Sequence, residues 1–141
     1  ALSHRVPPIP VLILTTQDDL TDRLETVRLG GRIFLQKPIA PAQVLTAVRQ
    51  VLQPINAEAK ILVVDDDPSI LAALRTLLEP WGLQVTALSD PQQFWQILEV
   101  TSPDLLILDI KMPHLSGVEL CQVVRNDARW SELPIIFLTA H

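Results

Sequence analysis

The stretch Ile61-Leu-Val-Val-Asp-Asp-Asp-Pro68 decides how the chain is expected to fold. Its first four residues form an apolar run rich in β-branched side chains, which is typical of a strand buried on both faces of a parallel sheet. Three acids follow directly, and Pro68 suits the first turn of a helix. The stretch therefore predicts a strand, an acidic turn and a helix in immediate succession.

The same alternation continues on both sides of this stretch. Toward the C-terminus, strands are expected at Leu83–Leu88, Leu105–Leu108 and Ile135–Leu138, with helices between them. Toward the N-terminus, strands are expected at Val11–Leu14 and Ile33–Leu35, each followed by apolar residues at helical spacing. Strands that alternate with helices indicate an α/β fold, in which helices cover both faces of a parallel sheet.

A linker is expected at Gln53–Ala59, because this segment holds a proline and an asparagine and shows no periodicity. We therefore divide the chain into residues 1–55 and residues 56–141. Pro10-Val-Leu-Ile-Leu-Thr15 in the first part and Pro134-Ile-Ile-Phe-Leu-Thr139 in the second are the same element written twice, about 124 positions apart. This repeat predicts that the ends of the chain are not natural domain boundaries.

Composition limits the classes of function. Hydrophobic residues make up 48% and charged residues 19% of the 141 residues, which argues against disorder. A net charge of −5 without a cluster of basic residues offers no surface for nucleic acid. The single cysteine, Cys121, is expected to be a core thiol in a reducing compartment, and no apolar run reaches the roughly 20 residues that a membrane span needs. We expect a cytoplasmic location.

Acidic residues follow two of the expected strands, Asp65 and Asp66 after one and Asp109 after the other. In open parallel sheets, ligands bind at the carboxyl ends of the strands. Carboxylates gathered there would repel one another unless a cation lay among them, and carboxylate and backbone carbonyl oxygens are the ligands of Mg²⁺. Each motif alone has a plain alternative. Asp65–Asp67 could be a solvated cap on the next helix, and Asp109 could be a turn residue.

These residues resemble the motifs of bacterial two-component response-regulator receiver domains. Ile61–Pro68 is similar to the first-strand motif of that family. Asp104-Leu-Leu-Ile-Leu-Asp-Ile-Lys-Met-Pro-His-Leu-Ser-Gly117 is similar to the third-strand motif. The shorter stretches Leu12–Thr15 and Phe34–Pro38 resemble the fourth-strand and fifth-strand motifs. The order is unusual, because the motifs of the fourth and fifth strands come first.

The resemblance implies a flavodoxin-like, doubly wound sheet of five parallel strands in the family order 2-1-3-4-5. Residues 1–55 resemble the C-terminal half of one receiver, from strand 4 to helix 5. Residues 56–141 resemble the N-terminal part of a second receiver, from strand 1 to strand 4. The halves could reassemble in permuted order within one chain, or by exchange between two chains. One copy of strand 4 is surplus, and because an unpaired apolar strand invites pairing, we expect a homodimer. The native context would be a tandem-receiver protein.

The resemblance also implies a role for each matching residue. Asp109 would accept the phosphoryl group. Mg²⁺ would be held by Asp65, Asp66 and Asp109 together with the backbone carbonyl of Lys111. The phosphoryl oxygens would be met by Lys37 and by Thr15 or Thr139. Phe34 would be the aromatic switch residue, and the Lys37–Pro38 peptide would be cis. On sequence alone, Lys37 could instead be a strand-end charge, and each threonine an ordinary strand former.

The implied function is that of a phosphoacceptor module in a two-component or phosphorelay pathway. A histidine kinase or a histidine phosphotransfer protein would phosphorylate it with Mg²⁺ as cofactor, so it would be an acceptor domain rather than a turnover enzyme. A metal-dependent phosphatase with an aspartyl nucleophile is disfavoured, because Asp109-Ile-Lys111 lacks the second acid of Asp-x-Asp. A receiver-shaped interaction module, or an incomplete fragment without phosphotransfer, stays open. The discriminating observation is whether the assembly brings Lys37 beside Asp109.

Overall fold

The computed structural model describes residues 33–52, 59–112 and 115–139, and for Gln36 and Thr139 it describes the backbone. The strand expected at Val11–Leu14 and the helix after it lie outside these residues, as does most of the expected linker. The other expected strands are confirmed, each with bounds that differ by one residue.

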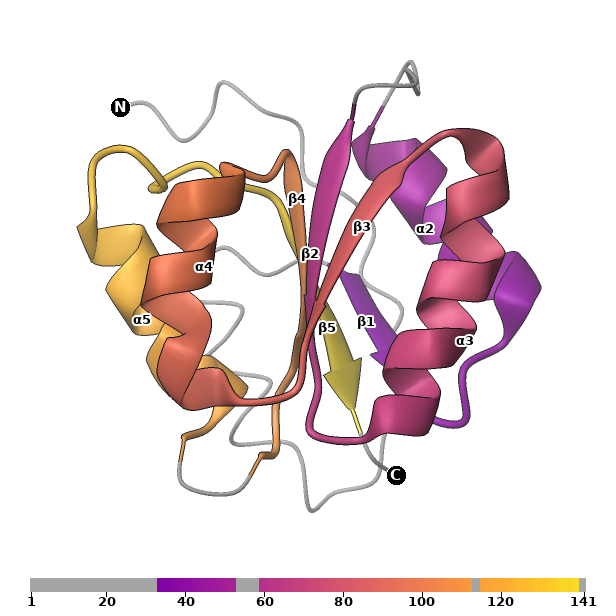
Figure 1. Cartoon of the computed structure of the whole chain (residues 1–141), viewed down its shortest axis with the longest axis horizontal. Helices are drawn as coiled ribbons and strands as arrows, with labels where there is room; N and C mark the ends of the chain where they lie inside the picture. Colours follow the sequence, from indigo (N-terminus) through magenta and orange to yellow (C-terminus); the bar gives the residue numbers. More distant parts are fainter. Residues whose placement is uncertain (1–32, 53–58, 113–114, 140–141) are drawn as a thin grey trace.

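Five parallel strands form a single sheet among the described residues (Figure 1). They are hydrogen-bonded in the order β1-β5-β4-β2-β3. Their bounds are β1 Ile33–Gln36, β2 Lys60–Val64, β3 Gln84–Leu88, β4 Leu105–Asp109 and β5 Ile135–Thr139. The predicted five-stranded parallel sheet is confirmed. In the chain's own numbering the order is not 2-1-3-4-5, because β1 lies at the sheet edge beside β5, the last strand.

Helices cover both faces of the sheet, as expected. Figure 1 shows α2 (Pro41–Val51) and α3 (Pro68–Leu78) on one face, and α4 (Phe94–Thr101) and α5 (Gly117–Asn126) on the other. Short 3-10 turns extend the end of α3 and precede α4, at Glu79–Trp81 and Pro91–Gln93. None of the helices in the described part of the chain is long and apolar enough to cross a membrane.

The apolar runs of the strands supply two cores. In β2, Ile61 and Val63 pack into the layer of α2 and α3, whereas Leu62 and Val64 pack into the layer of α4 and α5. Neighbouring side chains of a strand point to opposite faces, so a strand covered on both sides needs an unbroken apolar run. Cys121 is one of the buried residues in the second layer, as predicted.

Local signals set where the helices begin. The Asp67 carboxylate accepts a hydrogen bond from the Ser69 amide, and Pro68 takes the first helical position of α3. At the start of α5, Ser116 and Glu119 form a reciprocal capping box. Both helices therefore start directly after the loops that follow β2 and β4, and this fixes the backbone around Asp65 and Asp109.

Strand β1 joins the two parts of the chain. It pairs in parallel with β5, so that Phe34 lies opposite Phe137, and their rings stack with centroids 5.6 Å apart. Val44 and Val48 of α2 are fully buried and belong to the same core as residues of β2 and β4. The Arg49 guanidinium lies 4.5 Å from the ring centroid of Trp81, beyond the end of α3. Residues before the expected linker thus complete the sheet formed by the residues after it.

Val48→Asp should abolish cooperative folding of the whole sheet, because it places an unpaired charge in a fully buried position. We expect the loss to exceed about 4 kcal/mol, measured by urea unfolding followed by circular dichroism. Gln43→Asp is the matched control, since it adds the same side chain to an exposed position of α2 and should change stability by less than about 0.5 kcal/mol. An unfolding curve of Val48→Asp like that of the unaltered chain would show that α2 does not belong to this core.

Candidate functional site

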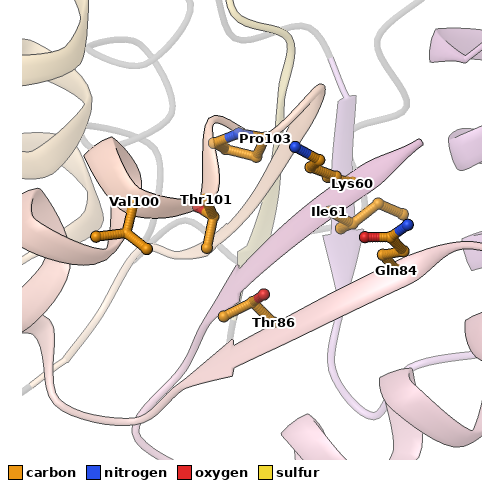
Figure 2. A pocket seen from close by; sticks show the side chains of 7 residues that line it. All are labelled: Lys60, Ile61, Gln84, Thr86, Val100, Thr101 and Pro103. Atoms are coloured by element: carbon orange, nitrogen blue, oxygen red, sulfur yellow. The ribbon is translucent and has the colours of Figure 1, made fainter. Parts of the chain in front are cut away.

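The candidate site lies at the carboxyl edge of the sheet. Asp65 directly follows β2, Asp109 is the last residue of β4, and Lys37 directly follows β1. Because the strands are parallel, these ends meet at one edge although the residues are far apart in sequence. A pocket of about 210 Å³ lies at the opposite edge, where its lining includes Lys60 and Gln84, the first residues of β2 and β3 (Figure 2). None of the acids lines that pocket.

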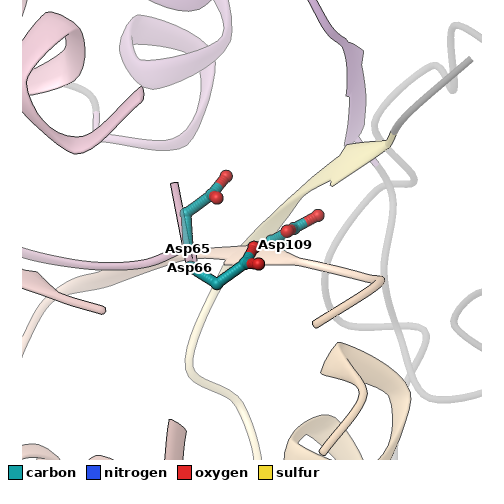
Figure 3. A group of neighbouring side chains, drawn as sticks. All are labelled: Asp65, Asp66 and Asp109. Carbon is teal, nitrogen blue, oxygen red and sulfur yellow. The ribbon is translucent and has the colours of Figure 1, made fainter. Parts of the chain in front are cut away.

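Three carboxylates converge at the carboxyl edge (Figure 3). One oxygen from each of Asp65, Asp66 and Asp109 lies within 4.8 Å of the others. Asp65 and Asp109 are 0% and 1% exposed, whereas Asp66 is exposed to solvent. Two carboxylates of the cluster are therefore buried, and the third is open to water.

Backbone amides hold the two buried carboxylates. The Asp67 amide donates to Asp65 Oδ1 at 2.9 Å, and the Lys111 amide donates to Asp109 Oδ1 at a longer 3.4 Å. The Oδ2 atoms of both aspartates are buried and receive no well-directed hydrogen bond. One oxygen of each carboxylate is thus fixed by the loop after its strand, and the other is left for a charged partner.

Lys37 supplies a positive charge to both of these oxygens. Its Nζ lies 2.8 Å from Asp65 Oδ2 and 3.2 Å from Asp109 Oδ2, contacts that are ion pairs by distance. The Lys37 side chain is 19% exposed, so the ammonium is largely withdrawn from water. The structure thus brings Lys37 beside Asp109, and the Lys37–Pro38 peptide is cis, as expected from the resemblance.

Burial controls the protonation of this cluster. Burial and the neighbouring Asp65 carboxylate together raise the pKa of Asp109 to about 7, against the opposing effect of Lys37. Burial likewise raises the pKa of Asp65, although Lys37 and the Asp67 amide partly offset it. Burial alone would lower the pKa of Lys37, but the two carboxylates outweigh it and the pKa is raised. The single positive charge of Lys37 therefore does not fully compensate the negative charges of the two buried carboxylates.

The donor set fits a small divalent cation. All three candidate ligands are carboxylate oxygens, which hard cations such as Mg²⁺ prefer. The two buried Oδ2 atoms share the single Lys37 ammonium and receive no well-directed hydrogen bond, so a cation would compensate their remaining charge. Asp66 adds a third oxygen from the solvent side, where water could complete the coordination shell. The residues present therefore suit a divalent metal ion.

The remaining predicted site residues are placed less completely. Thr15 lies outside the described residues. The backbone of Thr139 ends β5 opposite Gln36, which is the residue that precedes Lys37. Phe34 is buried against Phe137 in the layer of α4 and α5. Lys111 is exposed on the loop after β4. Gly117 was given no role from the sequence, although it packs against the backbone of Asp109. The signal that could have indicated it is a glycine at the first position of the helix that follows Asp109.

Fold and site together define an α/β protein of the doubly wound class, with a candidate metal centre at the carboxyl edge of its sheet. A family model described as the response regulator receiver domain matches residues 61–141. The chain belongs to this family, whose members are the receiver domains of two-component systems.

Known proteins of the same kind are similar to the chain. Protein RcaC of Microchaete diplosiphon is 42% identical over 137 residues, which are 97% of this chain and 21% of RcaC. The DNA-binding response regulator MtrA of Mycolicibacterium smegmatis is 38% identical over 81 residues, which are 57% of this chain and 34% of MtrA. The chain thus spans between a fifth and about a third of the length of these relatives.

Solved structures agree with this assignment. The N-terminal domain of a response regulator receiver protein from Methanoculleus marisnigri JR1 matches with a TM-score of 0.56 and 34% identity, covering 58% of this chain and 67% of that domain. The BeF3-activated N-terminal receiver domain of Klebsiella pneumoniae RstA matches with a TM-score of 0.52 and 29% identity, covering 57% of this chain and 66% of that domain.

Lys37→Met should tighten the binding of a divalent cation, because the ammonium now neutralises two of the oxygens that the cation would use. At pH 8.5, we expect Mg²⁺ affinity measured by calorimetry to rise by roughly fivefold or more. Lys60→Met is the matched control, since Lys60 is exposed at the other end of β2, and it should leave the affinity within about twofold. Weaker Mg²⁺ binding by Lys37→Met would show that Lys37 does not compete with the cation for the carboxylate oxygens.

Mg²⁺ affinity should rise with pH and level off above about 7, the value to which the pKa of Asp109 is raised. Below that pH the metal-free Asp109 carries a proton that a cation has to displace, so binding releases protons. Calorimetry between pH 5.5 and 8.5, in buffers of different ionisation enthalpy, would measure this proton release. Asp109→Asn should lose most of the dependence on pH. A flat profile for the unaltered chain would mean that Asp109 is already ionised at low pH.

Proposed function

We propose that this chain is a phosphoacceptor module of a two-component or phosphorelay pathway, and that Asp109 accepts the phosphoryl group with Mg²⁺ as cofactor. The observation that carries the proposal is the contact of Lys37 Nζ with Asp109 Oδ2 at 3.2 Å, next to two more carboxylates. An interaction module that no longer accepted phosphate would not need an acid, an ammonium and a metal-binding cluster gathered at one point.

In the proposed reaction, the Asp109 carboxylate oxygen attacks phosphorus and forms an acyl phosphate. The bond from phosphorus to the histidine nitrogen of the donor breaks, and that nitrogen keeps the electron pair. Asp65, Asp66, Asp109 and the Lys111 carbonyl would hold Mg²⁺, which would supply charge neutralisation to the transferring group. Lys37 would leave the carboxylates and pair with the phosphoryl oxygens, together with the hydroxyl of Thr139 or Thr15. Phe34, packed on Phe137, would then respond as the switch residue.

Similarity to transcriptional response regulators supports the proposed partners. MtrA of Mycolicibacterium smegmatis is named a DNA-binding response regulator, and PhoP of Bacillus subtilis is named a transcriptional regulatory protein of alkaline phosphatase synthesis. We propose a histidine kinase or a histidine phosphotransfer protein as the donor, in the cytoplasm. The chain would act as an acceptor and not as a turnover enzyme.

We further propose that the sheet is a receiver sheet in permuted order. If β2, β3, β4 and β5 are counted as receiver strands 1 to 4 and β1 as strand 5, the observed order becomes 5-4-3-1-2, which is 2-1-3-4-5 counted from the other edge. Residues 1–55 would then be the C-terminal half of one receiver and residues 56–141 the N-terminal part of the next. The similarity to RcaC supports a tandem-receiver origin, because it extends over 97% of the chain, across both parts.

Phosphoryl acceptance can be tested with acetyl phosphate as donor and intact mass as readout. The chain should gain a single phosphoryl group in the presence of Mg²⁺ and none when a chelator removes the metal. Asp109→Asn should abolish the gain. Asp104→Asn, which changes an exposed acid at the opposite end of β4, should not affect it. A folded chain that binds Mg²⁺ but gains no mass would favour the interaction module.

A mixing experiment separates a permuted monomer from a homodimer with exchanged halves. Asp109→Asn and Lys37→Met chains would be unfolded together, refolded and tested for phosphorylation. In an exchanged dimer, the Asp109 of one chain meets the Lys37 of the other. A mixed dimer therefore contains one intact site, and activity should return to roughly a quarter of that of the unaltered chain. A permuted monomer gives no recovery. Full recovery is excluded in both cases, because half of the sites in a mixed dimer carry both substitutions.

A further inference from the structure

The start of α5 packs against the backbone of Asp109 more closely than any side chain would allow. A Cβ atom on Gly117 would lie 2.3 Å from the Asp109 carbonyl oxygen and 2.9 Å from the Ile110 Cα. The Gly117 amide donates to the Ile110 carbonyl oxygen at 2.7 Å. The peptide that carries Asp109 is therefore held directly by the first residue of α5.

Space, and not backbone conformation, requires glycine at position 117. Among the described residues, the glycine with positive φ is Gly82, at φ 88°, in the turn after α3. Gly117 has no such conformation to accommodate, and it is the first helical residue after the Ser116 cap. Of the two glycines in the described part of the chain, Gly82 is thus required by backbone conformation, and Gly117, which lies at the candidate site, is required by space.

The position of Asp109 is fixed from both sides. The amide of Ile110 donates to the Leu138 carbonyl oxygen of β5 at 3.0 Å. The carbonyl oxygen of Ile110 accepts a hydrogen bond from the Gly117 amide. The capping box of Ser116 and Glu119 sets the residue at which α5 starts. An added Cβ at position 117 would have to move roughly 0.7 Å to reach even 3.0 Å from the Asp109 oxygen. Catalytic and metal-binding groups tolerate displacements of only about 0.5 Å.

We propose that Gly117 is a positioning residue, whose missing side chain lets α5 hold the Asp109 peptide in the orientation that metal binding and phosphoryl acceptance require. This inference rests on the proposed function and adds a residue that contacts neither metal nor phosphate. Gly117 acts through the main chain of Asp109 and Ile110. The loop that continues to Lys111, whose carbonyl is a proposed ligand, is held by the same contact.

Gly117→Ala and Gly82→Ala make a matched pair for testing this inference. Both add one methyl group and both should lower the melting temperature. At 10 °C, with the fold verified by circular dichroism, Gly117→Ala should bind Mg²⁺ at least about tenfold more weakly by calorimetry, as is typical when a group that orients a ligand is lost. Gly82→Ala should stay within about twofold of the unaltered chain. Equal Mg²⁺ affinities for Gly117→Ala and the unaltered chain, or an equal loss in both variants, would overturn the proposal.

A measurement on the unaltered chain keeps the proposal testable even if Gly117→Ala fails to fold. The chain has four glycines, and Ser116-Gly117 is its one Ser-Gly pair. Labelling serine with ¹³C at the carbonyl and glycine with ¹⁵N therefore isolates a single amide signal, that of Gly117. This signal should shift on Mg²⁺ addition with the Kd found by calorimetry, while the Gly82 signal, selected through Trp81-Gly82, should not. A Gly117 signal that does not respond at saturating Mg²⁺ would refute the coupling.

Different results would overturn the proposed function and the positioning role of Gly117. An unaltered chain that binds no Mg²⁺ at all would overturn the proposed function and this inference with it. An unaltered chain that binds Mg²⁺ and is phosphorylated, alongside an equally competent Gly117→Ala, would overturn the inference and leave the proposed function intact.

Discussion

The ammonium of Lys37 between Asp65 and Asp109 is the interaction on which the rest of the site depends. Two carboxylates with exposures of 0% and 1% could not remain ionised side by side without a positive partner. Lys37 provides that partner from the end of β1, at 2.8 and 3.2 Å. Its charge does not fully offset burial and the neighbouring Asp65 carboxylate, which together raise the pKa of Asp109. A site whose negative charge is only partly compensated is suited to receive a cation.

This ion pair also ties the site to the topology of the sheet. Lys37 can reach the acids because β1 pairs with β5 at the edge, although β1 comes first and β5 last among the described strands. Stacking of Phe34 on Phe137 and burial of Val48 in the shared core stabilise that placement. The part of the chain that holds the acids and the part that holds the ammonium thus share one core and one cluster of charged groups.

Sequence reasoning reached much of this arrangement, for identifiable reasons. Unbroken apolar runs such as Ile61–Val64 predicted strands buried on both faces, and the acids after them marked the carboxyl edge. The contact of Lys37 with Asp65 and Asp109 could not be derived from spacing, since nothing in a linear pattern says that the first strand described lies beside the last. The close packing of Gly117 on Asp109 was also out of reach, because it depends on where α5 crosses the end of β4. Thr15 remains a prediction, and for Thr139 only its place at the end of β5 is established.

A double-mutant cycle tests the central ion pair most directly. The free energies of unfolding of the unaltered chain, Lys37→Met, Asp109→Asn and the double variant would be measured by urea denaturation without metal at pH 8.5. We expect a coupling energy between Lys37 and Asp109 of about 1–3 kcal/mol, with the double variant less destabilised than the sum of the single variants. Effects that add within about 0.5 kcal/mol would contradict the account, because they would mean that the two charged groups do not meet in solution.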